Sequence, residues 1–334
     1  MRKVFLLLAL MLPVALKAQH IEILQQGKPT SIRGLSVVDD NIAWISGSKG
    51  TIAITRDGGK TWDWMQVKGY EKSDFRDVEA FSSKDAIIMS SGTPALILKT
   101  TDGGETWQEK YKKIDTTYFF NAMDFDSPKH GLVLGDPIGG KFLLMETNDG
   151  GETWHPFKNL PNALPGEACF AASGTCLRLS KNLITIVWGG RRSGVYWLAS
   201  KSPDWVEASL PFAKQKQSQG AFSVATYKDQ TIFVGGDYAN DKRSDSVACY
   251  VSNWGYAISI SLPKIGPAGF QSCVEHIVLS TFLSTGTPGS NITIDGGKTW
   301  RKIDDTSYNV CRKAKNGTLV LLSGDHGRIG VLKP

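Results

Sequence analysis

Two arginines offer the clearest binding chemistry in this chain of 334 residues, because they recur in similar local settings. Arg33 lies in Ile32-Arg33-Gly34, and Arg76 lies in Phe75-Arg76-Asp77. A guanidinium group presents a rigid fork of N–H donors that holds a carboxylate through two parallel hydrogen bonds. Arginines at matching places of a repeated fold would face a common space, and they favour an acidic or polar ligand there.

Other polar and aromatic side chains occur in glycine-rich or charged stretches, which are typical of loops. Loops on a rigid scaffold commonly carry binding residues. The candidate ligand-binding or partner-binding residues are Arg33, Arg76, Asn121, Glu167, Arg191, Arg192, Asp237, Tyr238, Asp325 and His326.

These side chains also have purely structural interpretations. The arginines at positions 191 and 192, together with Lys242, can be solvated loop tips. Arg33 and Arg76 can instead pair with Asp77 or Glu167 and balance their charges in a water-filled channel.

No local motif of a catalytic or cofactor site accompanies these residues. The chain has no GxGxxG turn, no CxxCH haem-attachment motif and no cluster of cysteine and histidine. Its five histidines are widely spaced, at positions 20, 130, 155, 276 and 326. We expect no metal, no cofactor and no catalytic residue, although a Ser/His/Asp set without a local motif stays open.

An eight-residue pattern, Thr-x-Asp-Gly-Gly-x-Thr-Trp, recurs at residues 55–62, 100–107, 147–154 and 293–300. Asp-Gly supplies the positive backbone angles of a tight turn, and the aspartate can accept backbone N–H groups across it. The tryptophan has enough area to pack between neighbouring sheets. We expect these boxes to be structural through Asp57, Trp62, Asp102, Trp107, Asp149, Trp154, Asp295 and Trp300.

A second periodic feature is an apolar strand that runs into a glycine-containing turn. It occurs seven times, about 45 residues apart on average, at residues 43–47, 87–92, 131–135, 185–190, 231–236, 281–286 and 319–324. This spacing accommodates four short strands and their turns. The sequence therefore predicts an all-β fold, a seven-bladed β-propeller of four-stranded antiparallel blades, although the boxes at 200–205 and 251–255 are shortened or degenerate.

The last blade has only three strands of its own before the chain ends. Ile21-Glu-Ile-Leu-Gln25 is a spare alternating strand ahead of the first blade. We expect it to close the ring as the outer strand of the last blade, because closure removes an exposed sheet edge.

The propeller geometry sorts the polar residues into two faces. Loops that enter each innermost strand share one face with the loops between second and third strands, and we call it the loop face. The Asp boxes join third and fourth strands, so they occupy the opposite, Asp-box face. Arg33 and Arg76 should point toward the axial opening of the loop face, and the long connection from Asn159 to Thr175 should bring Glu167 there.

The repeated box is the Asp box of bacterial neuraminidase repeats. With seven blades and the strand Phe75-Arg76-Asp77-Val78, the chain resembles the photosystem II stability/assembly factor-like propellers. The segments 166–175, 189–195, 235–238 and 327–329 are similar to a secreted bacterial branch of that group. The resemblance implies the propeller fold over nearly the whole mature chain; proteins of that branch often carry the label oxidoreductase, and photosynthetic members chaperone a photosystem subunit.

The Asp boxes also raise an enzymatic alternative, a sialidase-like glycoside hydrolase. Such a site needs three arginines, a tyrosine with a glutamate, and an acidic aspartate. The Arg-Ile-Pro signature of sialidases is absent, since Gly34 and Leu35 follow Arg33, and sialidase propellers usually have six blades. The residues available for this site are Arg33, Arg76, Arg312 or Arg178, Tyr308 or Tyr238, Glu167 and Asp77.

The amino terminus predicts secretion. Residues 1–18 combine a basic start, an apolar run and a small residue before Gln19, as in a cleaved signal peptide, and the run is too short to span a membrane. The mature domain, residues 19–334, keeps 35 Lys and Arg against 32 Asp and Glu, with no basic run. We therefore expect a monomeric periplasmic or secreted protein that binds no nucleic acid.

The partner we expect is an envelope or secreted protein segment, or a glycan, held by a non-catalytic scaffold. Five cysteines are too few to define the fold by disulfides. Buried thiols are the default interpretation, and Cys169–Cys176 or Cys273–Cys311 is the pair that could form a bridge.

Overall fold

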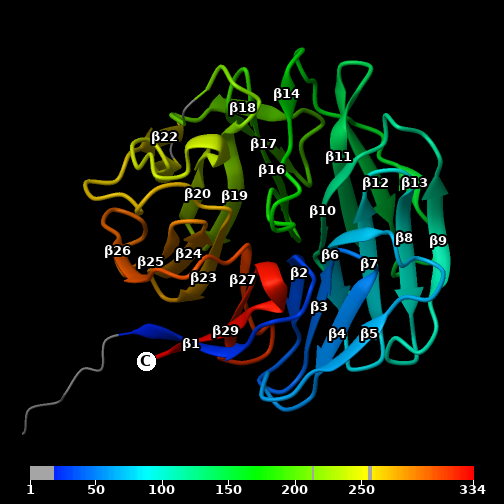
Figure 1. Ribbon diagram of the computed structural model, residues 1–334. Coiled ribbons are helices and arrows are strands. Elements are labelled where there is room, and N and C mark those ends of the chain that lie inside the picture. Colours follow the sequence, from blue (N-terminus) through cyan, green and yellow to red (C-terminus); the bar gives the residue numbers. More distant parts are fainter. Residues whose placement is uncertain (1–18, 213, 255–257) are drawn as a thin grey trace, which may run out of the picture.

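The computed structural model describes residues 19–212, 214–254 and 258–334. The expected signal peptide, residues 1–18, and Gly255 of the degenerate box lie outside the described residues. The chain forms a ring of four-stranded antiparallel sheets (Figure 1), which confirms the predicted all-β propeller. The described strands group into seven units, called blades 1 to 7 in chain order.

Each of the first four blades is built from four consecutive strands, with the innermost strand first. Blade 1 contains β2 (Ile32–Val37), β3 (Ala43–Gly47), β4 (Thr51–Thr55) and β5 (Asp63–Gln66). Blade 2 contains β6 (Asp74–Ala80), β7 (Ala86–Ser91), β8 (Ala95–Thr100) and β9 (Gln108–Lys113). Blade 3 contains β10 (Phe120–Phe125), β11 (Gly131–Ile138), β12 (Lys141–Thr147) and β13 (His155–Pro156). Blade 4 contains β15 (Leu177–Ser180), β16 (Leu183–Gly190), β17 (Gly194–Ala199) and β18 (Val206–Ser209), and the short β14 (Glu167–Ala168) pairs with the end of β16.

The remaining blades complete the ring. Blade 5 contains β19 (Gln219–Tyr227), β20 (Gln230–Asp237), β21 (Ala248–Trp254) and β22 (Ile258–Ser261). Blade 6 contains β23 (Cys273–Val278), β24 (Thr281–Gly286), β25 (Gly289–Thr293) and β26 (Arg301–Asp304). Blade 7 contains β27 (Val310–Lys313), β28 (Val320–Ser323) and β29 (Ile329–Lys333). Two short 3-10 helices, η1 (Tyr238–Asn240) and η2 (Asp325–Gly327), lie in loops.

The first described strand, β1 (His20–Gln25), closes the ring as predicted. It pairs antiparallel with β29, with Ile21 opposite Leu332, and becomes the outer strand of blade 7. Blade 7 also contacts blade 1 directly, because the amides of Lys315 and Asn316 donate to the carbonyls of Val37 and Val38. Both ends of the described chain are thereby tied into one blade.

The Asp boxes form closed hydrogen-bonded turns. In blade 2, Asp102 accepts the Thr106 amide at 3.0 Å and the Thr106 hydroxyl at 2.5 Å. The Thr100 hydroxyl donates to Asp102 and accepts the Gly104 amide at 3.0 Å. The Thr106 hydroxyl and amide are the main reasons that the pKa of Asp102 falls to about 2. The same bonds from the second threonine to the aspartate recur at Asp57, Asp149 and Asp295.

The second glycine of each box packs against the preceding blade. A Cβ atom on Gly59 would lie 3.0 Å from Leu24 Cδ1 of β1, and one on Gly151 would overlap Ile87 of β7. Both glycines also have positive φ angles, 90° and 81°, which favour a residue without a side chain. The boxes therefore join neighbouring blades, and the box of blade 1 contacts the strand that closes the ring.

The hydrophobic core lies between blades rather than in one centre. Trp44 of β3 is fully buried, packs edge-on against Trp107 of the second box at 6.4 Å between ring centroids, and donates to Ser82 O at 2.9 Å. All five cysteines are buried free thiols, including Cys273 and Cys311, whose sulfur atoms are 3.7 Å apart. Among the described residues, no helix is long and apolar enough to cross a membrane.

Closure of the ring by β1 can be tested by truncating one side chain. Ile21 is 7% exposed and packs in the core of blades 7 and 1, whereas Ile23 on the same strand is 44% exposed. We expect Ile21→Ala to lower the free energy of unfolding by about 2–4 kcal/mol, and Ile23→Ala by no more than about 0.5 kcal/mol. Urea denaturation of both variants measures the difference, and equal losses would contradict closure by β1.

The Asp boxes predict a loss of stability in acid. A carboxyl group whose pKa is lowered on folding contributes stability above its unfolded pKa, and this contribution is lost as the pH falls through the folded value. Stability should therefore fall between about pH 4 and the pKa of about 2 at Asp102. Asp102→Asn should make this fall shallower, measured by denaturation at a series of pH values. Glu105→Gln, an exposed change in the same box, is the control and should leave the pH profile unchanged.

Candidate functional site

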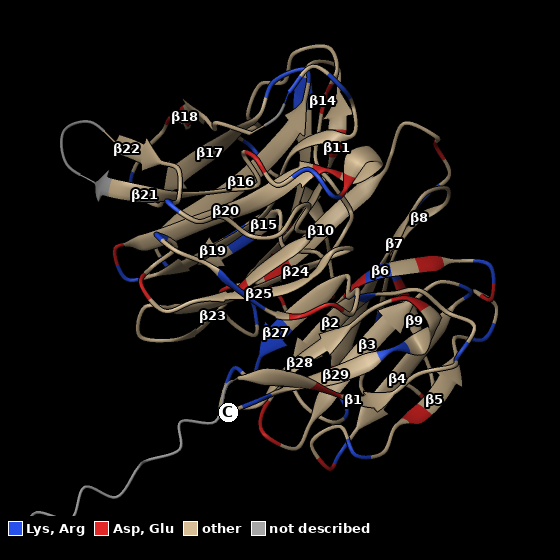
Figure 2. Ribbon diagram, turned by 60° about the vertical axis from the view of Figure 1, so that its left-hand side comes forward, with Lys and Arg blue, Asp and Glu red and all other residues tan. Residues whose placement is uncertain are grey.

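The loop face carries the longest connections of the propeller. Its loops display charged residues of both signs, visible in Figure 2 around β14 and β11. Most of the candidate residues lie on the inner-strand entries or the loops between second and third strands, as the predicted faces require. They separate into four groups: the arginines near the axis, the contacts of Glu167, two buried side chains, and the exposed residues in the loops of blades 5 and 7.

The two arginines of the inner strands meet a single segment of chain. Arg33 Nη1 donates to Ala172 O and Arg76 Nη1 donates to Ala171 O, each at 3.4 Å. Arg33 lies on β2 and Arg76 on β6, in neighbouring blades. Their guanidinium groups are thus directed to the axial region, and both contact the long connection between blades 3 and 4.

This segment, residues 169–176, crosses the axis of the ring, and we call it the crossing segment. Ser173 Oγ donates to Ser272 O at 2.8 Å, and Thr175 Oγ1 donates to Ser223 Oγ at 2.6 Å. A Cβ atom on Gly174 would overlap the carboxyl group of Asp77. Contacts to blades 2, 5 and 6 place the segment across the channel, so the axial opening expected on the loop face is occupied by the protein's own backbone.

The crossing segment was not foreseen from the sequence, although its composition carries a signal. Ala171-Ala172-Ser173-Gly174-Thr175 is a run of small residues, which lets backbone approach the inner strands closely. Phe170 anchors its start by stacking on Phe222, with 3.7 Å between ring centroids.

The charges of the two arginines are balanced differently. Arg76 Nε lies 2.7 Å from Asp74 Oδ2, so Arg76 pairs with neither Asp77 nor Glu167. In the described part of the chain, Arg33 has no carboxylate within ion-pair distance. Burial and the nearby Arg76 lower the pKa of Arg33, while Asp325 and Asp74 oppose this effect from a longer range. Arg33 is therefore a partly desolvated cation without a direct counter-ion.

Glu167 is engaged by another arginine. Its side chain is 1% exposed, accepts from Arg192 Nε at 2.6 Å and also accepts the amide of Leu164 at 2.8 Å. The Arg192 guanidinium lies over the Trp188 ring, 5.1 Å from its centroid. Arg191, by contrast, is exposed. A cavity of about 360 Å³ beside this pair is lined by residues 136–137, 140 and 163–168.

Two candidate residues are buried and support their neighbours. Asn121 is fully buried and its amide donates to Asp136 Oδ1 at 2.8 Å; burial raises the pKa of Asp136. Asp237 is 4% exposed, accepts from Gln219 Nε2 at 2.9 Å and caps η1 by accepting the Ala239 amide. These side chains shape the loop face rather than present themselves on it.

The last group lies on the surface. Tyr238 is 55% exposed and packs edge-on against Phe222. Asp325 is exposed and accepts from Asn309 Nδ2 at 3.0 Å and from the Ser31 hydroxyl. His326 is also exposed and has a left-handed backbone, with φ at 59°. The exposed candidates are Arg191, Tyr238, Asp325 and His326, while Arg33, Arg76 and Arg192 are half-buried.

The residues of the sialidase-like alternative do not converge. Asp77 is buried and accepts the amides of Val78 and Met123 at 2.9 and 2.8 Å. Tyr308 is 1% exposed. Arg178 and Arg312 line a cavity on the Asp-box face, separated from Arg33 and Arg76 by the crossing segment. Within the described ranges, no group of three or more His, Cys, Asp or Glu side chains could hold a metal ion.

Comparisons with known proteins agree with this architecture. Residues 17–111 match the family model described as photosynthesis system II assembly factor YCF48. A search of curated proteins found no match. Among solved structures, one described as YCF48 bound to D1 peptide is similar, with a TM-score of 0.66, 16% identity and coverage of 96% of this chain and 99% of that chain.

Two further solved structures are similar to the chain. YCF48 from Cyanidioschyzon merolae has a TM-score of 0.66 and 15% identity, covering 93% of this chain and 98% of that one. The Pan2 WD40 domain of Neurospora crassa has a TM-score of 0.60 and 12% identity, covering 91% of this chain and 89% of that one. The chain thus has a β-propeller fold that resembles photosystem II assembly factors.

The two adjacent loop arginines predict contrasting effects on stability. Arg192→Met leaves the buried Glu167 carboxylate without its ion-pair partner, so the free energy of unfolding should fall by about 1–3 kcal/mol. Arg191→Met changes an exposed side chain and should alter stability by less than about 0.5 kcal/mol. Guanidinium denaturation of both variants measures this, and a larger loss for Arg191→Met would contradict the assignment.

Proposed function

We propose that this protein is a non-catalytic scaffold that holds an acidic or polar protein segment on its loop face. The observation that carries the proposal is Arg33, a half-buried guanidinium on that face with no carboxylate partner among the described residues. Arg76 lies in the neighbouring blade and contacts the adjacent carbonyl of the crossing segment. A carboxylate from a partner would supply the counter-charge that Arg33 lacks.

The energetics favour a partner with a negative or strongly polar group. A partly desolvated cation beside a second cation is unfavourable, which is why the pKa of Arg33 is lowered. A bound carboxylate would offset the repulsion between Arg33 and Arg76 and would accept hydrogen bonds from their guanidinium groups. We therefore expect the two arginines to contribute much of the binding free energy. Tyr238 offers exposed aromatic area on the same face, of the kind enriched in protein interfaces.

The fold comparison supports a protein segment as the class of partner. A solved propeller of similar fold is described as bound to a peptide. Protein-segment binding is the part of the proposal that this comparison supports, while the face and the residues rest on the geometry above. Glycan binding by the same polar loops is the alternative outcome.

The cellular setting is part of the proposal. Residues 1–18 have the pattern of a cleaved signal peptide, so the mature chain would reach the periplasm or the outside of the cell. The partner would then be an envelope or secreted protein.

The test is an affinity pull-down with the mature protein from an envelope extract of its own organism. We expect Arg33→Ala combined with Arg76→Ala to reduce capture of the partner by at least about tenfold, because two charge-assisted contacts are lost. The variant should keep a thermal midpoint close to that of the wild type, because the contacts of both arginines to the crossing segment are long and the Arg76–Asp74 ion pair is partly exposed.

The matched control removes two arginines outside the loop face, Arg56→Ala combined with Arg301→Ala, and should keep full capture. Equal capture by all three proteins would contradict the proposal. If removal of the partner's glycans alone releases it from the protein, the loop face binds a glycan and not a protein segment.

A further inference from the structure

A second cavity lies at the axis on the Asp-box face, opposite the proposed partner site. It has a volume of about 600 Å³, within the range of small-molecule sites. The later parts of six innermost strands line it, from blades 1, 2, 3, 4, 6 and 7. The crossing segment contacts residues near the entries of the inner strands, on the loop-face side of this cavity.

Two guanidinium groups share one carboxylate at this cavity. Arg178 Nη2 is 2.8 Å from Glu275 Oε2, and Arg312 Nη1 is 3.7 Å from the same oxygen. Arg178 Nε also donates to Val224 O, and Arg312 Nε donates to Leu35 O. Arg312 Nη1 is buried and has no hydrogen-bond acceptor among the residues that the structure describes. One buried guanidinium nitrogen of the pair therefore has a free N–H donor from which a ligand oxygen could accept a hydrogen bond.

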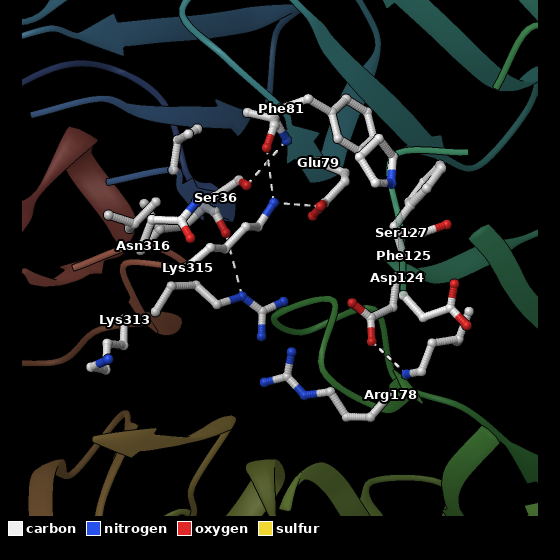
Figure 3. A pocket seen from close by; sticks show the side chains of 18 of the residues that line it. Ser36, Glu79, Phe81, Asp124, Phe125, Ser127, Arg178, Lys313, Lys315 and Asn316 are labelled. Carbon is white, nitrogen blue, oxygen red and sulfur yellow. Dashed lines mark hydrogen bonds and ion pairs between the residues drawn. The ribbon is translucent and has the colours of Figure 1, made fainter. Parts of the chain in front are cut away.

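The other carboxylates of the cavity are already engaged, as Figure 3 shows for Glu79 and Asp124. Glu79 pairs with Lys315, and Asp124 accepts the amide of Leu179 at 2.6 Å. Burial raises the pKa of Asp124 to about 6. With a pKa of about 6 this carboxyl group is mostly ionised at neutral pH, so it balances part of the charge of Arg178.

One wall of the cavity is apolar and aromatic. Phe81 and Phe125 line it and pack edge-on against each other, 5.2 Å between ring centroids. In Figure 3 these two rings lie on the other side of the cavity from Arg178. The cavity thus combines donors for an anion with a surface for an apolar body.

We propose that the axial cavity binds a small carboxylic acid with an aromatic or branched apolar body. The carboxylate accepts hydrogen bonds from Arg312 and Arg178, and the body packs against Phe81 and Phe125. Neither half of this recognition suffices alone: a bare anion lacks the apolar contacts, and a neutral isostere leaves the guanidinium groups without an acceptor.

The test uses phenylacetate as the probe, with acetate and 2-phenylethanol as its two halves. Isothermal titration calorimetry and thermal unfolding of the full mature chain, all at one ionic strength, should give saturable binding and a raised thermal midpoint with phenylacetate. Acetate and 2-phenylethanol should each bind at least tenfold more weakly. Equal midpoint shifts with all three compounds, or none with phenylacetate, would overturn the proposal.

Variants separate binding from folding. Arg178→Lys keeps the positive charge but loses the fork of N–H donors, so it should lower the affinity for phenylacetate at least tenfold. Arg312→Gln removes the buried guanidinium group and should also lower this affinity, with circular dichroism to confirm that the chain is folded. Phe125→Leu should lower the affinity for phenylacetate but leave the affinity for acetate unchanged. Lys60→Gln, on the same face within the first Asp box, is the control, and a loss of binding equal to that of Arg178→Lys would overturn the assignment.

Discussion

The contact between the crossing segment and the inner strands determines what each end of the propeller can do. Gly174 lies against the buried carboxyl group of Asp77, and the hydroxyls of Ser173 and Thr175 bond to blades 6 and 5. Backbone therefore fills the axis where many rings of strands leave an opening. On the loop side its carbonyls receive Arg33 and Arg76, and on the other side a separate cavity remains.

The Asp boxes of blades 1, 2, 3 and 6 support this arrangement by packing each of these blades on the preceding one. In each box, the threonine and aspartate side chains form the hydrogen bonds that close the turn. The second glycine has no side chain, so the turn can pack on the preceding blade. The box of blade 1 contacts Leu24 of β1, the strand that completes blade 7. Local turn chemistry and ring closure thus support the same geometry, and loops on such a frame hold fixed positions.

Much of the fold could be predicted from the sequence because its signals are local and repeated. The box pattern, the apolar strands at about 45-residue spacing and the spare strand at 21–25 are all short-range features. The sites are harder, because burial and partner choice depend on long-range packing. Asn121 and Asp237 have the residue types of a binding surface, yet packing buries them. Arg178, Glu275 and Arg312 are about 40 to 130 positions apart, so no motif announces that they share one cavity.

The proposed function requires that a protein segment binds the loop face and not the Asp-box face. The first measurement is photo-crosslinking in the extract that contains the partner. One variant carries a photoreactive side chain at position 191 and another carries it at position 60. We expect a crosslinked partner from position 191, on the exposed loop beside the Glu167–Arg192 pair, and none from position 60. A crosslinked partner from position 60 alone would contradict it and move the partner to the opposite face.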